Sequence, residues 1–401
     1  MKSSFLILSL IILALEFYVY QAVKTILRNE QLRIAYIVLT GLVYAYFFYS
    51  FFNLEKNSVN IQRLHKVSTI FIVFMLPKLF IVAFLLIDDL FRFLGFSIKK
   101  INGSYEYYPT RRKFLSYLGI GCFSFLSLFL LDGVMFGKYR HWVRRVKIKI
   151  PNLGKSFKGY KIVQISDVHS GSFESPEKLQ KAIDLINAQE PDLVLFTGDM
   201  VNNRASEFEP FIQLFKSIKA KDGKFSILGN HDYGSYVEWS NDEAKAENLS
   251  QLIKFQEQAG FRMLRNENTF IEKSGEKLYL VGVENWGEPP FPQYGDLDKA
   301  TESLPTEAPK ILMSHDPTHF DHIVKHHPSN IFLTLSGHTH GMQFGLDLKN
   351  IKWSPAKYRY PKWADLYQSN GKYLYVNRGF GVLGYPGRAG IYPEITLLLL
   401  Q

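Results

Sequence analysis

The sequence has very little cysteine, and the long apolar runs of its first third contain few charged residues. Cys122 is the one cysteine among 401 residues and lies inside such a run. No disulfide can therefore form within the chain, and cysteine usage does not indicate the redox compartment. The scarcity of charge inside the runs argues against an ion pathway. The chain is also too long for one domain of the usual size, so we expect at least two parts.

Four apolar runs in the first third are long enough to cross a bilayer, whose core needs about 20 apolar residues in a helix. Buried core helices rarely run so long without a polar face. The first run also exceeds the apolar part of a signal peptide and lacks a small-residue cleavage site. We expect residues 1–146 to form a transmembrane region and 147–401 a separate soluble domain. The expected spans lie near residues 3–23, 34–52, 67–87 and 114–131.

Two ionisable residues fall inside these runs: Glu16 in the first, and Lys78, beside Pro77, in the third. Charged groups at that depth pair with one another or face the helical bundle. A contact between Glu16 and Lys78 is one interpretation. A helix end with a lysine that reaches toward the membrane surface is the interpretation we favour.

The orientation of the soluble domain is not fixed by the basic residues, which lie on both sides of the expected spans. The even number of spans places the amino terminus and the soluble domain on the same side. The run 110–115, TRRKFL, resembles a twin-arginine export signal, although it is internal, and a plain basic membrane flank is the alternative. It favours a multi-pass protein of the cytoplasmic membrane whose soluble domain faces outward.

From residue 147 onward, short β-rich runs alternate with helical stretches, which indicates an α/β domain. Five of the expected strands end in Asp, Asn or His. Turn preference explains one such ending, but not five made of metal-ligand residue types. Because sites form where strands end in α/β sheets, we expect these residues to converge. The endings are Asp167-Val168-His169, Gly198-Asp199, Gly229-Asn230-His231-Asp232, Ser314-His315 and Gly337-His338-Thr339-His340.

These residue types suit a pair of divalent cations. Two cations about 3.5–4 Å apart can hold the attacking and leaving oxygens of a displacement at phosphorus. Such a pair needs a bridging carboxylate, with imidazole and carbonyl ligands to complete each coordination shell. Glycines beside the ligands allow sharp backbone turns and access to the ions. They are Gly198, Gly229, Gly337 and Gly341.

The five blocks resemble the signature of the calcineurin-like metallophosphoesterase family: D-x-H, G-D, G-N-H-D/E, H and G-H-x-H, in this order. They span roughly residues 160–341, and the segment Leu374–Leu400 is similar to the membrane-linked bacterial branch. The resemblance implies an α/β fold of four layers, with two mixed β-sheets packed face to face and helices outside, preceded here by the transmembrane helices. Residues 147–401 would then be the metallophosphoesterase catalytic domain.

The resemblance also implies roles for single residues. Asp167, His169 and His340 would hold one metal ion, and Asn230, His315 and His338 would hold the other. Asp199 would bridge them, and His231 would act on the substrate without binding metal. Mixed oxygen and nitrogen ligands suit manganese, iron or zinc.

Two positions depart from the family pattern. In many relatives an aspartate three residues after the bridging residue orients the catalytic histidine, and here Asn202 takes that place. Asn202 can accept a hydrogen bond but cannot stabilise an imidazolium by charge, so Asp232 is a candidate substitute. Met342 stands where this branch often has a glycine, which would reshape the rim of the site.

The expected function is hydrolysis of a phosphodiester or pyrophosphate bond, in a lipid or cell-envelope substrate. The branch includes enzymes that cleave a nucleotide-linked acylated sugar, so a UDP-diacylglucosamine-type lipid A precursor is a candidate. The net charge of +10 lies largely beside the apolar runs, which suits anionic lipid head groups better than nucleic acid. The alternatives are an inactive metal-binding scaffold and a membrane sensor that carries such a domain.

Several aromatic residues of the soluble domain have two open interpretations. They could form an amphipathic rim that touches lipid, because aromatic residues favour membrane interfaces. Packing beneath long loops is the alternative. The residues are Trp286, Trp353, Tyr358, Tyr360 and Trp363.

Overall fold

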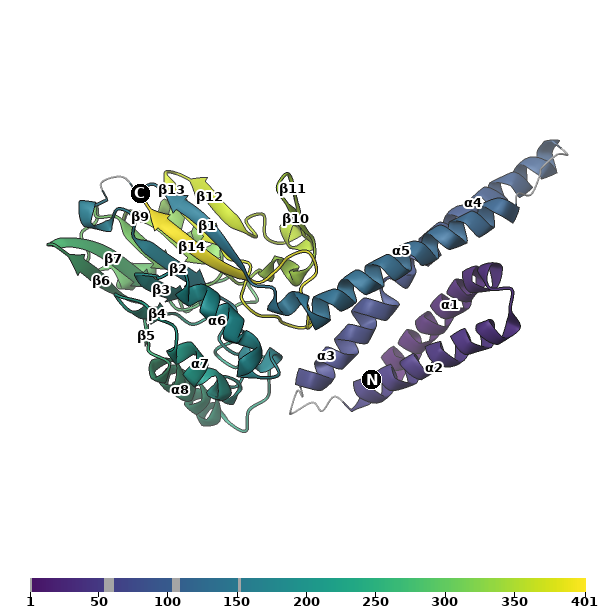
Figure 1. Cartoon of the computed structure of the whole chain (residues 1–401), viewed down its shortest axis with the longest axis horizontal. Helices are drawn as coiled ribbons and strands as arrows, with labels where there is room; N and C mark the ends of the chain where they lie inside the picture. The colour runs from purple at the N-terminus through teal and green to yellow at the C-terminus, as the bar shows by residue number, and fades with distance from the viewer. Residues whose placement is uncertain (1, 54–60, 103–108, 151–152) are drawn as a thin grey trace. The chain divides into compact units, whose positions relative to one another are not determined.

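A computed structural model describes residues 2–53, 61–102, 109–150 and 153–401 (Figure 1). The chain divides into two compact units, with the boundary between Asp132 and Gly133. The first unit is helical, and the second contains the β-sheets. We call them the helical unit and the catalytic unit, and each is described by itself.

The helical unit contains helices long and apolar enough to form four candidate membrane spans. Its described helices are α1 (Lys2–Ile26), α2 (Glu30–Phe52), α3 (Ile61–Thr69), α4 (Lys78–Asn102) and α5 (Pro109–Met135). The third expected span is not one continuous α-helix, because a π-helical turn, Ile70–Met75, follows α3. Pro77 then separates this turn from α4, consistent with the lack of a backbone N–H at proline.

Lys78 and Glu16 form an ion pair in the helical unit. The lysine side chain is 1% exposed, so it does not reach toward the membrane surface, and the interpretation we favoured from the sequence is wrong. The hydroxyls of Tyr36 and Tyr44 also donate hydrogen bonds to the Glu16 carboxylate. In an apolar environment a charged side chain is stable only with such partners. This explains why Lys78 pairs with Glu16 and does not extend alone toward the membrane surface.

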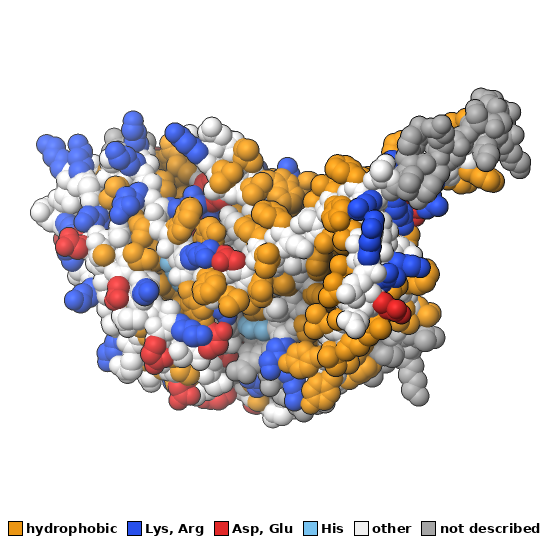
Figure 2. Space-filling view, turned by 45° about the vertical axis from the view of Figure 1, so that its right-hand side comes forward, with side chains coloured by type: hydrophobic (Ala, Val, Ile, Leu, Met, Phe, Trp, Pro, Cys, Tyr) orange, Lys and Arg blue, Asp and Glu red, His pale blue; other side chains and the backbone are white. Residues whose placement is uncertain are grey.

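The helical unit carries large apolar side chains on its outer surface. Phe17 is 71% exposed and Phe125 is 74% exposed. Figure 2 shows orange apolar side chains over much of the face of these helices that is in view. A water-soluble bundle turns its polar residues outward, whereas this pattern is that of helices surrounded by lipid.

The catalytic unit contains two six-stranded mixed sheets. The first runs in the order β1 (Trp142–Ile148), β14 (Glu394–Leu400), β2 (Lys161–Ile165), β3 (Leu193–Phe196), β4 (Lys224–Ser226) and β5 (Phe261–Met263). The second runs in the order β12 (Asp365–Ser369), β13 (Lys372–Val376), β9 (Ile331–Ser336), β8 (Lys310–Met313), β7 (Glu276–Gly282) and β6 (Glu267–Lys273). Four neighbouring strands in each sheet are parallel.

The two sheets pack face to face over a shared apolar core. Ile162 and Leu195 from the first sheet lie in one cluster with Leu280 and Leu333 from the second. Strands in this position are buried on both faces, which explains their continuous apolar runs.

Helices cover the outer faces of the sheets. Helices α6 (Gln180–Asn187), α7 (Ile212–Lys216) and α8 (Asp242–Gln258) lie along the first sheet (Figure 1). Helices α9 (Leu297–Thr301) and α10 (Thr318–His322) pack on the second. The four-layer α/β sandwich expected from the sequence is therefore confirmed.

Candidate metal centre

The five strand endings meet at one site between the two sheets. Strands β2, β3 and β4 contribute from the first sheet, and β8 and β9 contribute from the second. Several candidate ligands adopt left-handed backbone conformations, which non-glycine residues rarely do. Such strain persists only where the surrounding structure enforces it, and it concentrates at functional sites. These residues are Asp167 (φ 53°), His169 (47°), Asp199 (61°), His338 (70°) and His340 (51°).

Two glycines at the site are required for close approach. A Cβ atom on Gly229 would lie 2.2 Å from Oδ1 of Asp199, and a Cβ atom on Gly337 would lie 2.0 Å from Oγ of Ser166. Any side chain at either position would displace the ligand loops. Their role is thus the close packing of backbone segments, whereas Gly198 and Gly341 have positive φ angles.

Asp167, His169 and His340 form the first group of side chains that could hold a metal ion, with one ligand atom of each lying within 4.8 Å of the others. Nε2 of His169 lies 3.1 Å from Nε2 of His340. Nε2 of His340 lies 3.3 Å from Oδ1 of Asp167. The three side chains are almost fully buried and direct their donor atoms toward one another.

A second group joins Asp167, Asp199 and His315 within the same limit. Oδ2 of Asp199 lies 3.1 Å from Nε2 of His315 and 3.6 Å from Nε2 of His169. One oxygen of Asp199 thus faces both groups. This is the position that a bridging carboxylate needs.

Asn230 and His338 complete the second group. Nδ1 of His338 lies 3.0 Å from Oδ1 of Asn230 and 3.3 Å from Nε2 of His315. The seven candidate metal ligands of the sequence analysis therefore come together in the fold.

The donor atoms of this site fit divalent cations. Nδ1 of His315 donates to the backbone carbonyl of Thr197 at 2.8 Å, which leaves Nε2 with its lone pair toward the site. Nε2 of His338 lies 2.8 Å from the hydroxyl of Tyr360, so its Nδ1 faces the site in the same way. Nitrogen and oxygen donors that converge in this way can share one cation. Imidazole nitrogens with carboxylate oxygens are the donors that manganese, iron and zinc accept.

The charges of the site also favour a bound cation. Burial disfavours the imidazolium of His315, but the Asp199 and Asp167 carboxylates outweigh it and raise its pKa to about 10. Burial also lowers the pKa of His169, His338 and His340, so these rings stay neutral. The carboxylate cluster thus demands a positive charge, which a cation would supply in place of the His315 proton.

His231 lies beside the candidate ligands without joining them. Its backbone N–H donates to Oδ1 of Asp199 at 2.8 Å, and its Nδ1 donates to the backbone carbonyl of Asn202 at 2.8 Å. The orienting acceptor is therefore main chain rather than the Asn202 side chain. Nε2 of the ring remains for a substrate.

Asp232 does not orient His231. Its carboxylate accepts hydrogen bonds from the backbone N–H groups of Asp199, Met200, Val201 and Gly229. Burial and the neighbouring Asp199 raise its pKa to about 7. Asp232 thus braces the loop that carries the candidate bridging residue, and the catalytic role considered for it finds no contact with His231 in the described residues.

Several residues around the site were missed by sequence reasoning. Nε2 of His338 lies 3.4 Å from Oδ2 of Asp316, which immediately follows His315 and could have been noticed for that reason. Glu207 accepts the backbone N–H of Asn202 at 2.6 Å. Arg388 is fully buried and lies with Nη2 3.1 Å from Nδ1 of His340. Neither Glu207 nor Arg388 belongs to a pattern that the sequence displays.

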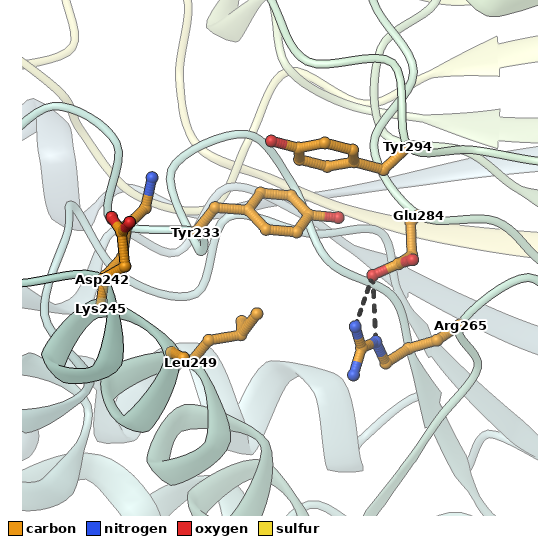
Figure 3. Close-up of a pocket in the computed structure, with 8 residues that line it drawn as sticks. Tyr233, Asp242, Lys245, Leu249, Arg265, Glu284 and Tyr294 are labelled. Atoms are coloured by element: carbon orange, nitrogen blue, oxygen red, sulfur yellow. Dashed lines mark hydrogen bonds and ion pairs between the residues drawn. The ribbon is translucent and has the colours of Figure 1, made fainter.

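A pocket of about 460 Å³ lies apart from the candidate ligands (Figure 3). Tyr233 and Tyr294 pack with ring centroids 4.9 Å apart, between side chains of α8 and the ion pair of Arg265 with Glu284. Tyr233 follows Asp232 directly, so the pocket begins one residue beyond the metal-site loop. None of the seven candidate ligands lines it.

The fold and this donor set define a class of protein, a metallophosphoesterase domain joined to a transmembrane domain. The family described as "Calcineurin-like phosphoesterase" matches residues 160–344. The family described as "Probable Calcineurin-like phosphoesterase, transmembrane domain" matches residues 1–138.

Known proteins resemble the chain over most of its length. The "Uncharacterized metallophosphoesterase YkuE" of Bacillus subtilis is 31% identical over 63% of this chain and 83% of its own length. A "Transmembrane protein with metallophosphoesterase domain" of Danio rerio is 28% identical over 64% of this chain and 56% of its own length. An "Uncharacterized metallophosphoesterase" of Helicobacter pylori strain J99 is 28% identical over 77% and 76%. The chain belongs to the calcineurin-like metallophosphoesterase family and carries a transmembrane domain.

Proposed function

We propose that this protein hydrolyses a phosphodiester or pyrophosphate bond with two divalent cations at the candidate metal centre. The observation that carries the proposal is the position of Asp199. One of its oxygens faces ligand candidates of both groups, and the other accepts the backbone N–H of His231. A single carboxylate thus links both ion positions to the residue that would act on the substrate.

Each side chain then has one task. Asp167, His169 and His340 would hold one ion, Asn230, His315 and His338 would hold the other, and Asp199 would serve both. When bound, the ions would polarise the phosphoryl group and activate water for in-line attack. His231, held through Nδ1 by the Asn202 carbonyl, directs Nε2 at the leaving-group oxygen. In its doubly protonated form this Nε2 donates a proton as the bond to phosphorus breaks.

The proposed substrate is a lipid or cell-envelope molecule that carries a phosphate, and nucleic acid is not the proposed substrate. Four candidate spans and a net charge of +10 favour a substrate in or at an anionic membrane. We place the catalytic unit on the external face of the cytoplasmic membrane, on the strength of the twin-arginine-like run. An internal position would instead favour a nucleotide-linked acylated sugar such as a UDP-diacylglucosamine-type precursor.

The same arginines have a second role in the fold. Nε of Arg111 lies 2.7 Å from Oδ1 of Asp88, and Nη1 of Arg112 lies 2.8 Å from Oδ1 of Asp89. These pairs join α5 to α4. The arginines therefore have a structural role whether or not they act in export.

The proposed activity is tested with the full chain purified in detergent. The protein would be loaded with manganese, iron or zinc and given a nitrophenyl phosphodiester, a nitrophenyl phosphomonoester and a pyrophosphate-linked lipid. We expect turnover of the diester or the pyrophosphate, and its loss in Asp199→Ala, whose carboxylate faces both ligand groups. A protein that binds two metal ions but turns over none of the three compounds would support the alternative of an inactive scaffold.

A further inference from the structure

A short hairpin follows the last candidate metal ligand. It consists of β10 (Leu346–Leu348) and β11 (Ile351–Trp353), with Lys349 and Asn350 in the turn. Leu346 pairs with Trp353, and Leu348 pairs with Ile351. Because paired residues share one face of a hairpin, these four apolar side chains lie together.

Three members of this face point outward, whereas Trp353 is half-buried against Phe344. Leu346 is 46% exposed, Leu348 60% and Ile351 56%. A single exposed leucine is common on protein surfaces. Exposed apolar side chains that lie together on one side of a hairpin instead indicate a surface that contacts another molecule or a membrane.

The polar face of the hairpin points into the catalytic unit. Oδ2 of Asp347 lies 3.0 Å from Nε of Arg378, which is fully buried. Nζ of Lys352 lies 2.6 Å from Oδ2 of Asp365. A hairpin on a water-exposed surface has the opposite arrangement, with its apolar face inward. The hairpin is therefore anchored by its charges and leaves its apolar face for another environment.

Two apolar residues close to the hairpin in sequence are exposed as well. Met342 is 48% exposed and Tyr358 is 76% exposed. Lys349 in the turn and Lys357 beside Tyr358 are also exposed. Apolar and aromatic side chains with lysines at their border are the composition of surfaces that enter the head-group region of an anionic membrane. The aromatic residues with two interpretations divide between them. Tyr358 is exposed and Trp353 is half-buried on the hairpin face. Tyr360 and Trp363 are buried, and Trp286 packs against His319 and His322.

The same segment touches the metal centre. The hydroxyl of Tyr360, two residues after Tyr358, lies 2.8 Å from Nε2 of His338. The hydroxyl of Ser354, which follows β11, donates to the carbonyl of Gly341 at 2.6 Å. The exposed face and the candidate ligands are thus parts of one continuous structure.

We propose that the β10–β11 face, together with Met342 and Tyr358, inserts into the interfacial layer of an anionic lipid bilayer. The candidate spans of the same chain keep a bilayer within reach at all times. Docking of this face holds the metal centre at the level of lipid phosphate groups. The inference depends on the match to the transmembrane-domain family and on the exposed β10–β11 face, and it does not require the proposed activity.

A depth measurement on the full chain tests the inference. An environment-sensitive nitrobenzoxadiazole probe is attached to Leu348→Cys, with Cys122→Ala as background, in nanodiscs of phosphatidylcholine and phosphatidylglycerol. The matched control carries the probe at Glu272→Cys, which is exposed in β6, at the edge of the second sheet opposite β12. We expect doxyl-labelled lipids to quench the probe at position 348 and not at 272, and the quenching to weaken without phosphatidylglycerol.

A second variant guards against misfolding. Leu348→Ser with Ile351→Ser, carrying the probe at Leu346→Cys, should lose the quenching that the Leu346→Cys probe shows alone, with unchanged bound metal. Equal quenching at positions 348 and 272, or none at either, would overturn the inference. Cross-linking of two chains through Leu348→Cys without lipid quenching would assign the face to a second copy instead.

Discussion

His231 donates its Nδ1–H to the backbone carbonyl of Asn202, 2.8 Å away, and not to a carboxylate. The family pattern places an aspartate at this position to orient the histidine by charge. Here the orientation survives the exchange of the side chain because the acceptor is an atom that every residue has.

Asn202→Ala should therefore keep most of the activity. The side chain of Asn202 accepts a hydrogen bond from Ser172 Oγ at 3.3 Å and also interacts with Glu207, and neither contact involves the His231 ring. His231→Ala should lose about 10²–10⁴-fold in kcat, the usual contribution of a general acid, with both metal ions retained. Steady-state kinetics with metal analysis compare the two variants. A loss in Asn202→Ala as large as in His231→Ala would show that the side chain itself orients the ring.

The loss in His231→Ala should also depend on the leaving group. Nitrophenolate needs no proton to depart, whereas an alkoxide does, so the defect should shrink with nitrophenyl esters. Rates for a series of esters with different leaving-group pKa values measure this. An equal loss across the series would contradict the role of proton donor.

Asp199→Ala should lose both metal ions and essentially all activity. Its carboxylate faces both ligand groups, and no other described carboxylate besides Asp167 belongs to them. Metal content by mass spectrometry is the measurement. Asp184→Ala, an exposed position on α6, serves as the control. Two ions retained in Asp199→Ala would mean that another residue is the bridge.

The ion pair of Lys78 with Glu16 should show strong coupling. Lys78→Met alone leaves the carboxylate without its cation in an apolar environment and should cost about 3 kcal/mol, whereas Glu16→Gln with Lys78→Met should cost much less. Unfolding of the full chain in detergent, as a double-mutant cycle, measures the coupling free energy. Additive effects of the two single substitutions would show that Lys78 and Glu16 lie close together without a stabilising interaction between them.

His141 should make the catalytic unit sensitive to acid. Burial lowers its pKa from 6.5 to about 4, so the folded state favours the neutral ring. The corresponding stability is fully present above pH 6.5 and is lost as the pH falls toward 4. It amounts to about 3 kcal/mol at 1.36 kcal/mol per pKa unit. Unfolding of wild type and His141→Gln across this range should show a steeper loss in wild type, and identical slopes would contradict it.

Cysteine labelling decides the side of the membrane. We expect Glu272→Cys, in the Cys122→Ala background, to react with a membrane-impermeant thiol reagent on intact cells, because the proposal places the catalytic unit outside. Labelling only after lysis would place it inside. The proposed substrate would then shift toward the nucleotide-linked lipid precursor, since an inward site meets the inner leaflet and soluble nucleotides.

The strands and candidate ligands were accessible from the sequence because the chemistry is local. Each buried strand is a short apolar run, and each run ends directly in the side chains concerned. Strand β8 ends immediately before Ser314-His315, and β9 ends immediately before Gly337-His338. Which sheet each strand joins was not local information, since pairing depends on contacts distant in the chain. Arg388 was missed for the same reason, because it reaches His340 from far along the sequence. Glu207 is close to Asn202 in the chain, but no pattern of apolar residues or ligand types marked it.

The pairing of Lys78 could not be read from composition either. Its outcome depends on which way the residue faces, and the preceding turn is π-helical, Ile70–Met75, a geometry that apolar periodicity does not reveal. The backbone N–H of Leu76 bonds to the carbonyl of Phe71, five residues earlier, at 2.8 Å.

Because of that turn, the angular position of α3 relative to Lys78 depends on the number of residues between them. A π-helical turn holds one residue more than an α-helical turn, and each residue of an α-helix advances about 100° around the axis. Deleting one residue from Ile70–Met75 would restore the regular repeat and rotate everything upstream relative to Lys78 by about that angle. Loss of that residue would thus change which side of α3 faces the rest of the helical unit, without altering Lys78 or Glu16.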